Sequence, residues 1–386
     1  MSRHKGLPDS SIHQAGRLVV GGMILAAGGV TVGMSSAWAA SGEGTAGAIL
    51  ARLPFGARSL GLGGPHGALG GSPGTMTVNP ASLMSNGDGA AEAGFHRSAA
   101  DTTYGGLAAA YAPKPWITAG VNVLTLTAGE FETWDAVGSK YTAQLQEDRV
   151  IGAAGAAALG PASLGIGLRH YASTVAGTAA GSALLGDLGA RVRIALAPPP
   201  GWDPDLTRDP NPNGIDLSLA ATGLFGSPDY GGAADAGPAI YRAGAALTST
   251  LRGATSLLLA SLDTPRETAR LQAGAGWELR FPFDGVTASG RVGGRFRKGS
   301  GTMAAGLGVA YSGLSIDYAF VSADAPFAQT HHVTAGFDLA AFRRARRPRQ
   351  DRFEPLPTLG TSAPSTLPPK QAEDSTPAAI PEPPPP

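Results

Sequence analysis

The chain has no cysteine, few charged residues and no long apolar run beyond its first forty positions. The lack of Cys excludes disulfides, thiol chemistry and Cys-ligated metal sites. Charged residues make up 15% of the chain, and 29 basic residues balance 29 acidic ones, so nothing in the composition would attract nucleic acid. After Ala40 no stretch approaches the ~20 apolar residues of a membrane-spanning helix. A mature chain that crosses a membrane must therefore cross it with strands.

What the chain does contain is glycine, 57 residues in all, and a repeated alternation. From 270 to 280 every second residue is apolar, and the same pattern returns from 286 to 297 and from 313 to 321. Successive side chains of a strand point to opposite faces, so each segment would have one apolar and one polar face. Long amphipathic strands joined by Gly-rich turns predict an all-β fold, a transmembrane antiparallel β-barrel of about 14 strands.

Clusters of Gly, Pro and Asp divide the region 90–339 into the candidate strands of this barrel. An even number of strands brings both ends of the barrel to one side, which is the periplasm for an exported barrel. Two of the longer loops predicted on the outer side are 128–147 and 225–238, and a long turn at 198–212 is predicted on the periplasmic side. The predicted strands are 90–98, 103–112, 116–127, 148–159, 162–174, 184–197, 213–224, 239–250, 254–264, 267–280, 284–297, 301–311, 313–322 and 329–339.

Three segments lie outside the strands. A basic start, an apolar stretch and Ala37-Trp38-Ala39 predict a signal peptide over 1–39, with an uncleaved anchor as the alternative. Residues 40–89 are Gly-rich and predict an N-terminal plug. Residues 340–386 are rich in Arg and Pro, which predicts a disordered periplasmic tail that could contact a periplasmic partner.

Five stretches in this order support a resemblance to a known family. They are 44–50 (GTAGAIL), 56–64 (GARSLGLGG), 79–83 (NPASL), 313–320 (GLSIDYAF) and 330–332 (THH). Together the stretches resemble the PorV/PorQ family of bacterial outer membrane proteins, which is related to the FadL-type transporters. The family implies a fourteen-stranded barrel with its N-terminal segment in the lumen. Some members carry secreted cargo proteins in type IX secretion, whereas the FadL relatives pass hydrophobic molecules.

The chain departs from the family pattern in a few places. The family's Asn-Pro-Ala-Gly-Leu has Ser82 in place of glycine, and both the long 198–212 turn and the tail look like additions. These departures weaken a direct transfer of the secretion role.

The plug motif is the first candidate site. It comprises Gly56, Ala57, Arg58, Gly61, Gly63, Gly64, Asn79 and Pro80. A phosphate-binding loop would need a preceding strand and a Gly-Lys-Ser/Thr end, and both are missing. The glycines are instead expected to allow close backbone approach in a tightly bent segment. Arg58 is expected to pair with a carboxylate of the lumen wall such as Glu278 or Asp317, and Asn79-Pro80 to fix a turn.

Charged residues on the polar faces of the strands form the second candidate site. They include the proposed lumen charges Glu278, Arg280, Arg291, Arg295 and Asp317. Paired charges that rigidify a polar lumen are the favoured interpretation, and a basic passage for anionic groups is the alternative.

Catalysis is not expected. His331 and His332 are adjacent on a strand, so they point to opposite faces and cannot bind one metal ion together. His170 shares a face with outward aliphatic residues, and His66 lies in the plug. No Gly-x-Ser-x-Gly motif occurs. The chain is therefore predicted to be non-enzymatic, with no catalytic, cofactor or metal site.

The sequence predicts a bacterial outer membrane protein that contacts membrane lipid and no nucleic acid. Its main predicted function is the handling of secreted cargo proteins, and the alternative is a FadL-like channel for small hydrophobic molecules. Aromatic residues in the predicted outer loops could anchor a protein partner. They are Phe131, Trp134, Phe225 and Tyr230.

Overall fold

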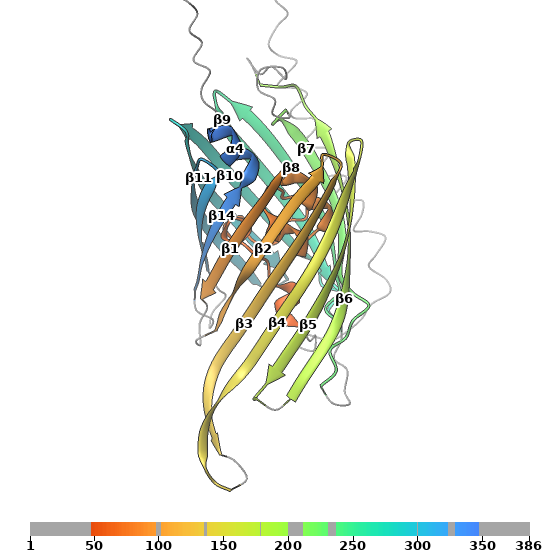
Figure 1. Ribbon diagram of the computed structural model, residues 1–386, viewed down its shortest axis with the longest axis vertical. Coiled ribbons are helices and arrows are strands. Elements are labelled where there is room, and N and C mark those ends of the chain that lie inside the picture. Colours follow the sequence, from red (N-terminus) through yellow and green to blue (C-terminus); the bar gives the residue numbers. More distant parts are fainter. Residues whose placement is uncertain are drawn as a thin grey trace, which may run out of the picture. The chain divides into compact units, whose positions relative to one another are not determined.

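The alternating segments all form strands, and the strands close into one barrel. The computed structural model describes residues 48–97, 102–134, 137–177, 179–199, 211–230, 237–298, 300–322 and 329–346. Each strand pairs antiparallel with its sequence neighbours, and β1 pairs with β14 to close the ring (Figure 1). The prediction of a fourteen-stranded antiparallel barrel is confirmed. The predicted signal peptide and the chain from 347 onward lie outside the described residues.

The strands follow one another with two-residue links at one end of the barrel, except between β6 and β7, where most of the predicted long turn 198–212 lies outside the described residues. We call this end the α4 end, because β1 begins and β14 ends beside helix α4, and the opposite end the hairpin end. The strands are β1 Gly89–Arg97, β2 Thr103–Lys114, β3 Ile117–Trp134, β4 Lys140–Leu159, β5 Ala162–Val175, β6 Ala179–Ala195, β7 Gly214–Leu224, β8 Ile240–Leu251, β9 Ala254–Pro265, β10 Gln272–Phe283, β11 Val286–Arg297, β12 Ser300–Tyr311, β13 Leu314–Val321 and β14 Thr330–Asp338.

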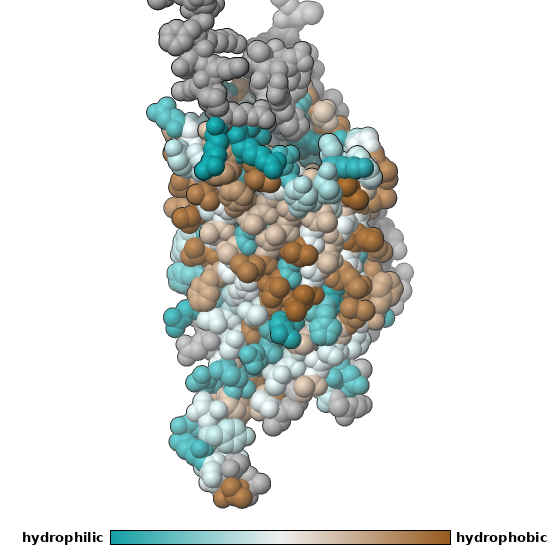
Figure 2. Space-filling model, viewed as in Figure 1, coloured by the Kyte–Doolittle hydropathy of each residue, from teal (hydrophilic) through white to brown (hydrophobic). Residues whose placement is uncertain are grey.

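The outer wall of the barrel is largely apolar. Figure 2 shows hydrophobic and weakly polar residues over most of the wall, with hydrophilic residues at the α4 end and along the lower hairpin. Aliphatic side chains that a soluble protein would bury are half or more exposed here. Examples are Leu107, Val121, Leu164, Ile166, Leu168, Leu219, Leu307 and Ile316. Such an outward belt is the surface of a barrel embedded in a membrane. No helix in the described ranges has the length and apolar character needed to span a bilayer.

The lumen holds the segment 48–88 as a plug. Its short helices are η1 Ile49–Arg52, α2 Ala57–Gly61, η2 Pro73–Thr77 and η3 Pro80–Ser85. Helix α2 contacts β11 to β14, whereas η3 contacts β3 to β6. Most residues of 55–83 are buried, so the core of this barrel lies between the plug and the inward faces of the strands.

The predicted loop 128–147 is wrong, because β3 and β4 continue through most of it. Beyond Thr127, where the pairing with β2 ends, β3 pairs with β4 alone. Figure 1 shows this two-stranded hairpin projecting from the barrel. Cross-strand contacts hold it together: Gln144 Nε2 donates to Glu130 Oε1 at 2.9 Å, and Lys140 Nζ lies 2.6 Å from Glu132 Oε2. Side-chain pairs of this kind stabilise an isolated ribbon.

Three other predicted boundaries are corrected, the first of which is that β6 begins at Ala179 instead of 184. Strand β10 begins at Gln272 instead of 267, because a turn closed by the Ala269 amide and the Pro265 carbonyl (2.9 Å) intervenes. The tail does not begin at 340, because Leu339–Arg346 forms α4. The Asp338 carboxylate accepts from the Ala341 amide at 2.9 Å, as an N-cap residue does. Phe342 packs edge-on against Phe337, which fixes the helix on the barrel.

Candidate functional site: the plugged lumen

Arg58 of α2 is the main ionic anchor of the plug. Its Nε and Nη2 lie 3.1 and 2.9 Å from the two carboxylate oxygens of Glu278 on β10, and its Nη1 donates to the Gly70 carbonyl at 2.6 Å. A bidentate arginine–carboxylate pair fixes both distance and orientation. Arg58 therefore has the lumenal partner that the sequence predicts. Burial of the guanidinium lowers the pKa of Arg58, but the attraction and hydrogen bonds of Glu278 together with the charges of Asp317 and Glu92 leave the pKa above its ordinary value.

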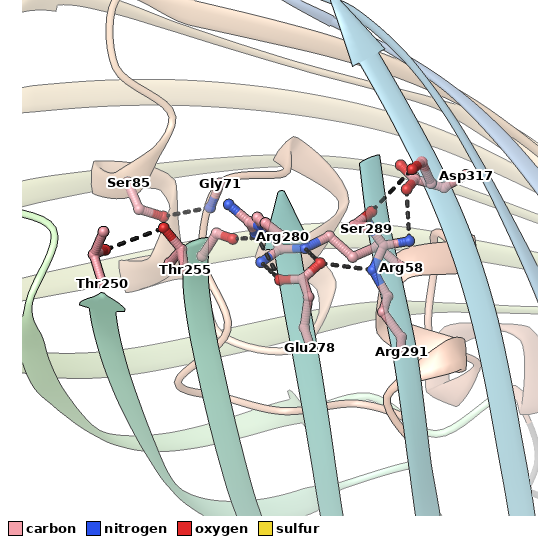
Figure 3. Close-up of polar contacts among 12 residues, drawn as sticks. Arg58, Gly71, Ser85, Thr250, Thr255, Glu278, Arg280, Ser289, Arg291 and Asp317 are labelled. Atoms are coloured by element: carbon pink, nitrogen blue, oxygen red, sulfur yellow. Dashed lines mark hydrogen bonds and ion pairs between the residues drawn. The ribbon is translucent and has the colours of Figure 1, made fainter. Parts of the chain in front are cut away.

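Glu278 is the centre of a larger charge cluster at the α4 end. Arg280 Nη2 and Arg291 Nε lie 2.7 and 2.6 Å from its oxygens, and Arg291 Nη1 reaches Asp317 on β13 at 2.6 Å. Figure 3 shows these side chains converging from β10, β11, β13 and the plug. Glu278 is fully buried and accepts from three arginines. This cluster pairs its charges internally, which matches the favoured rigidifying interpretation.

Further ion pairs follow the wall of the lumen. Arg295, the remaining predicted lumen charge, contacts Asp263 at 2.6 Å and Gln272 at 2.9 Å. Sequence reasoning did not single out the other pairs as sites, although their residues alternate with apolar ones. They are Arg169–Asp187 (2.6 Å), Arg191–Asp216 (3.0 Å), Arg193–Asp216 (2.9 Å), Arg242–Asp263 (3.8 Å), and Arg52–Glu267 at the hairpin end.

The glycine motif brings the plug backbone into contact with the wall. Gly63 has a φ of 90°, and a Cβ on it would lie 2.4 Å from the Gly294 nitrogen of β11. Only glycine fits both the backbone conformation and the space. Gly61 and Gly64 make similar close approaches to Gly306 and to Arg295. The expected close backbone packing is observed.

The residues around α2 complete this anchor. Gly56 is the N-cap residue of α2 with a φ of 95°. The buried Ala57 donates its amide to Thr334 Oγ1 of β14 at 2.8 Å. These contacts attach the start of α2 to the strand that closes the barrel.

Asn79 and Pro80 begin η3, as their predicted turn role requires. Asn79 Oδ1 accepts from the Ala81 amide at 3.0 Å, and its Nδ2 donates to the Gly67 and Ala190 carbonyls. Pro80 occupies the first position of η3, where its missing N–H is not needed. Ser82 is buried and donates to the Gly67 carbonyl at 3.1 Å, which gives a structural role to the residue that departs from the family pattern.

Sequence reasoning missed Glu92 as a plug anchor. This buried β1 residue accepts from Ser72 Oγ at 2.7 and 2.8 Å and from the Gly74 amide at 2.5 Å. A single acidic residue in the small-residue strand 90–98 is the signal that could have found it. Two carboxylates from distant strands therefore hold the plug, Glu92 on β1 and Glu278 on β10.

The hairpin end of the lumen is different, because its wall is partly apolar. We define the hairpin-end cluster as the buried wall residues Ala108, Leu124, Leu126, Val150, Tyr171, Ala183 and Leu185 together with Ala48, Leu50, Ala51 and Phe55 of the plug. Leu50 and Phe55 are almost fully buried against this wall. The first residues of the plug thus occupy the largest of the apolar clusters between plug and wall, and smaller ones lie deeper along the lumen among its ion pairs.

The predicted loop aromatics are not a single surface. Phe131 and Trp134 lie on the β3–β4 hairpin, where Phe131 is half-buried and Trp134 is exposed. Phe225 is 90% exposed beside Gly186 on the wall. Tyr230 is not exposed as expected, because its ring packs over Gly181, where a Cβ would come within 2.6 Å. Only Trp134 and Phe225 keep the exposure that a partner-binding residue needs.

The four histidines considered from the sequence do not converge on one site. His331 is exposed and contacts Tyr318 Oη at 2.8 Å, whereas His332 is buried in the lumen. Their opposite orientation is as predicted. His170 faces outward, and His66 is buried in the plug, where its Nε2 donates to the Leu62 carbonyl at 2.7 Å. Burial lowers the pKa of His66 below its ordinary value.

No protein-family model and no curated protein sequence matches the chain. Several solved structures of membrane barrels are similar to it. The toluene transporter TbuX of Ralstonia pickettii is 11% identical, with 73% of this chain and 96% of TbuX covered and a TM-score of 0.47. The toluene transporter TodX of Pseudomonas putida is 11% identical, with 74% of this chain and 97% of TodX covered and a TM-score of 0.46. A FadL homologue from Pseudomonas aeruginosa is 9% identical, with 74% of this chain and 98% of the homologue covered and a TM-score of 0.43. Similarity at this level transfers neither a substrate nor a mechanism to this chain.

Proposed function

We propose that the protein is an outer membrane channel that admits small hydrophobic molecules from the hairpin end. The hairpin-end cluster is the observation that carries this proposal. Leu124, Leu126 and Leu185 point into the lumen of a barrel whose opposite wall is charged. An apolar lumenal wall with few polar groups suits a small apolar ligand. This was the alternative function in the sequence analysis.

The plug supplies the gate in this proposal. Leu50 and Phe55 cover the apolar wall as a hydrophobic ligand would, so a ligand must displace 48–55 to bind there. This displacement also breaks the ion pair of Arg52 with Glu267 and the bond from Arg169 to the Ala51 carbonyl. The rest of the plug stays in place, because Arg58, Ser72 and Asn79 hold it by directional bonds. Passage would therefore need movement of one segment and leave the barrel intact.

The orientation follows from the strand count. The start of β1 and the end of β14 both lie beside α4. The α4 end therefore faces the periplasm and the hairpin end faces the exterior. We propose a signal peptide at 1–39, export to the outer membrane, and a periplasmic partner for the tail. Membrane lipid covers the apolar wall.

Ligand binding by the purified barrel tests the main proposal. Titration calorimetry would use toluene as the small aromatic probe and palmitate as the long-chain probe. Leu185→Gln should weaken binding, because it places an amide in the hairpin-end cluster. Leu259→Gln is the matched control, since Leu259 is also a buried lumenal leucine but lies in a different cluster. Equal effects of the two variants, or no binding of either probe by the native protein, would refute the channel.

The handling of secreted proteins remains the second candidate, and the β3–β4 hairpin favours it. About seven residues per strand project beyond the neighbouring strands, roughly 23 Å at 3.3 Å per residue. The hairpin exposes Trp134, Tyr141 and Leu145 together with unpaired strand edges. Exposed edges and aromatic anchors are features that proteins use to bind other chains.

Co-purification from the native membrane tests this second candidate. Secreted proteins that share a C-terminal domain should be found with the native barrel and be lost with Trp134→Ala. They should be retained with Thr133→Ala, the neighbour on the opposite face. Secreted proteins recovered equally with both variants would exclude the hairpin as their binding surface.

A further inference from the structure

An open groove lies on the outer wall of the barrel where the first and last strands meet. Its volume is about 600 Å³, and its lining is almost entirely apolar. The groove exists because small side chains lie between large ones on the outward face of the sheet. In the register of β14, β1 and β2, the outward residues are Phe337, Ala91 and Ala109 in one row and Ala335, Ala93 and Leu107 in the next.

This groove must be filled when the barrel lies in a membrane. Water does not occupy an apolar space of this kind, and an empty groove would leave its lining without contacts. Hydrocarbon chains of the bilayer can fill it. Lipid chains are as apolar as leucine side chains, however, so the groove by itself does not distinguish one lipid from another. Any selectivity must come from polar groups at the end of the groove.

Helix α4 places a positive charge at one end of the groove. Phe337 of the groove packs edge-on against Phe342 of α4, with ring centroids 5.3 Å apart. The guanidinium carbon of Arg346 lies 4.6 Å from the centroid of the Phe342 ring, so two aromatic rings connect the groove to this charge. A guanidinium over an aromatic face is held in position and keeps its hydrogen-bond donors.

A second arginine of α4 lies on the other side of the groove, beside the start of β1. Arg343 Nη1 contacts a carboxylate oxygen of Asp88 at 3.1 Å, and both side chains are more than half exposed. Such an exposed pair is weak, and a guanidinium has five N–H donors, so a phosphate can bind Arg343 alongside Asp88. Helix α4 has a third arginine and no acidic residue. Figure 2 shows the hydrophilic residues of this end directly above the apolar wall.

We propose that this groove binds one anionic phospholipid, with an acyl chain over β14, β1 and β2 and its phosphate between Arg343 and Arg346. Arginine matches phosphate in charge and can donate two parallel hydrogen bonds to it. The inner leaflet of a bacterial outer membrane consists of phospholipids, and the orientation proposed above places the α4 end in that leaflet. The inference therefore rests on this orientation, and it does not depend on the channel function.

Native mass spectrometry of the full-length purified barrel tests the proposal without any variant. The barrel is mixed with equal amounts of palmitoyl-oleoyl phosphatidylglycerol and of the phosphatidylcholine with the same chains, whose choline cancels the phosphate charge. We expect one phosphatidylglycerol to be retained per barrel, preferred roughly 25-fold, or about fivefold for each of the two arginines. Added salt should reduce this preference, because it screens exposed charges.

Matched variants separate the charge from the groove. The double variant Arg343→Gln/Arg346→Gln should retain both lipids equally, whereas Arg252→Gln, on the β8–β9 turn at the same end, should keep the native preference. Ala93→Leu fills the groove and should reduce retention of both lipids. Ala275→Leu makes the same change at an outward alanine of β10 and should not. These side chains face solvent or membrane, so the changes leave the core intact.

Three results would overturn the proposal. The first is equal retention of the two lipids by the native protein, and the second is an unchanged preference in the double arginine variant. The third is a different occupant: a lipid-free dimer would show that a second copy fills the groove, and lipopolysaccharide retained from a parallel sample in place of the phospholipid would also reverse the orientation. Toluene titration of the same preparation tests the channel separately, so failure of the lipid site and failure of the channel are distinguishable.

Discussion

The two ends of the lumen hold the same plug by different means. At the α4 end, Glu278 accepts from Arg58, Arg280 and Arg291 within a closed set of ion pairs. At the hairpin end, Leu50 and Phe55 lie against an aliphatic wall, although the same segment also has polar contacts, because Arg52 pairs with Glu267 and Arg169 donates to the Ala51 carbonyl. Hydrogen-bonded ion pairs are directional and lose most of their energy when displaced, whereas apolar contacts are nondirectional and can be exchanged for another apolar surface.

This difference indicates which part of the plug can move. A hydrophobic ligand can replace Leu50 and Phe55 with contacts of the same kind, but no hydrophobic ligand can replace Arg58 on Glu278. The α4 end therefore acts as the fixed point of the plug, and the hairpin end as the exchangeable part. The four predictions below test this contrast, in order of decreasing effect.

Removal of the central carboxylate should give the largest effect. Glu278→Ala leaves three arginines close together in the lumen without their shared anion, and breaking a buried pair in this way costs about 3–5 kcal/mol. We expect a lower free energy of unfolding in urea titrations, faster proteolysis of the plug, and ion conductance in planar bilayers.

An exposed ion pair on the hairpin provides the control. Glu132→Ala removes the partner of Lys140, and both of these side chains are more than half exposed. Exposed pairs contribute little to stability, so unfolding and conductance should stay at native values. If Glu278→Ala behaves like Glu132→Ala, the charge cluster does not anchor the plug.

Truncation at the other end should have a smaller and more local effect. Leu50→Ala removes a fully buried side chain from the hairpin-end cluster, and such changes cost about 2–5 kcal/mol, with values near the low end where the site can collapse. We expect weaker attachment of 48–55, tighter binding of a hydrophobic probe, and no ion conductance, since the α4-end anchor is intact. Calorimetric titration with toluene and bilayer recordings measure both results.

The neighbouring residue separates this prediction from a general effect of truncation. Ile49 has the same number of carbon atoms but is 50% exposed, so Ile49→Ala should change neither probe binding nor stability appreciably. Ion conductance in Leu50→Ala would show that the two ends of the plug do not act separately.

The sequence predicted the fold well because alternation is a local property. All fourteen strands follow from inward and outward periodicity, and so does the lumenal orientation of Glu278 and Asp317. The β3–β4 hairpin was missed because Gly129 and the polar residues of its outer part resemble a loop, although Glu130, Glu132 and Lys140 all lie on one face of the ribbon. Helix α4 was missed because Arg-rich residues before a proline-rich segment resemble a disordered tail.

The site was only partly predictable from the sequence. Its apolar cluster depends on how far along the lumen a residue lies, and the contacts at the seam depend on how the first strand pairs with the last. In β3, Val121 and Val123 face outward while Leu124 and Leu126 face inward, so both faces are apolar and the hairpin-end cluster leaves no signature. The pairing of His96 with His332 depends on the register between the first and last strands. Alternation matched Arg58 only to a lumenal carboxylate such as Glu278 or Asp317, because inward faces also carry Glu92, Asp187, Asp216 and Asp263.

Loss of the hydrogen-bonded turn at Asn79 should lower the free energy of unfolding less than the changes at either end of the lumen. Asn79→Ala removes the N-cap of η3, which costs about 0.5–2 kcal/mol, and the bonds to Gly67 and Ala190. Asn79→Asp keeps the acceptor for the Ala81 amide and loses the two donated bonds, so its stability should lie between Asn79→Ala and the native protein. Urea unfolding measures all three proteins, and an Asp variant less stable than the Ala variant would contradict the cap.

The smallest effect at neutral pH should come from His66. Burial lowers the pKa of His66 in the folded protein, while the unfolded chain keeps a value of about 6.5. Below about pH 6.5 the unfolded state therefore binds a proton that the folded state does not. The free energy of unfolding decreases as the pH is lowered, by no more than about 1.4 kcal/mol per pH unit. Above that pH both states are neutral and His66 contributes no pH dependence. Other buried groups titrate as well, so the diagnostic quantity is the difference between the native protein and His66→Gln in urea unfolding at pH 5 and pH 7.5. The native protein should lose more stability on acidification than His66→Gln. Equal losses would mean that the plug opens at His66 before the barrel unfolds, which would extend the exchangeable part of the plug beyond 48–55.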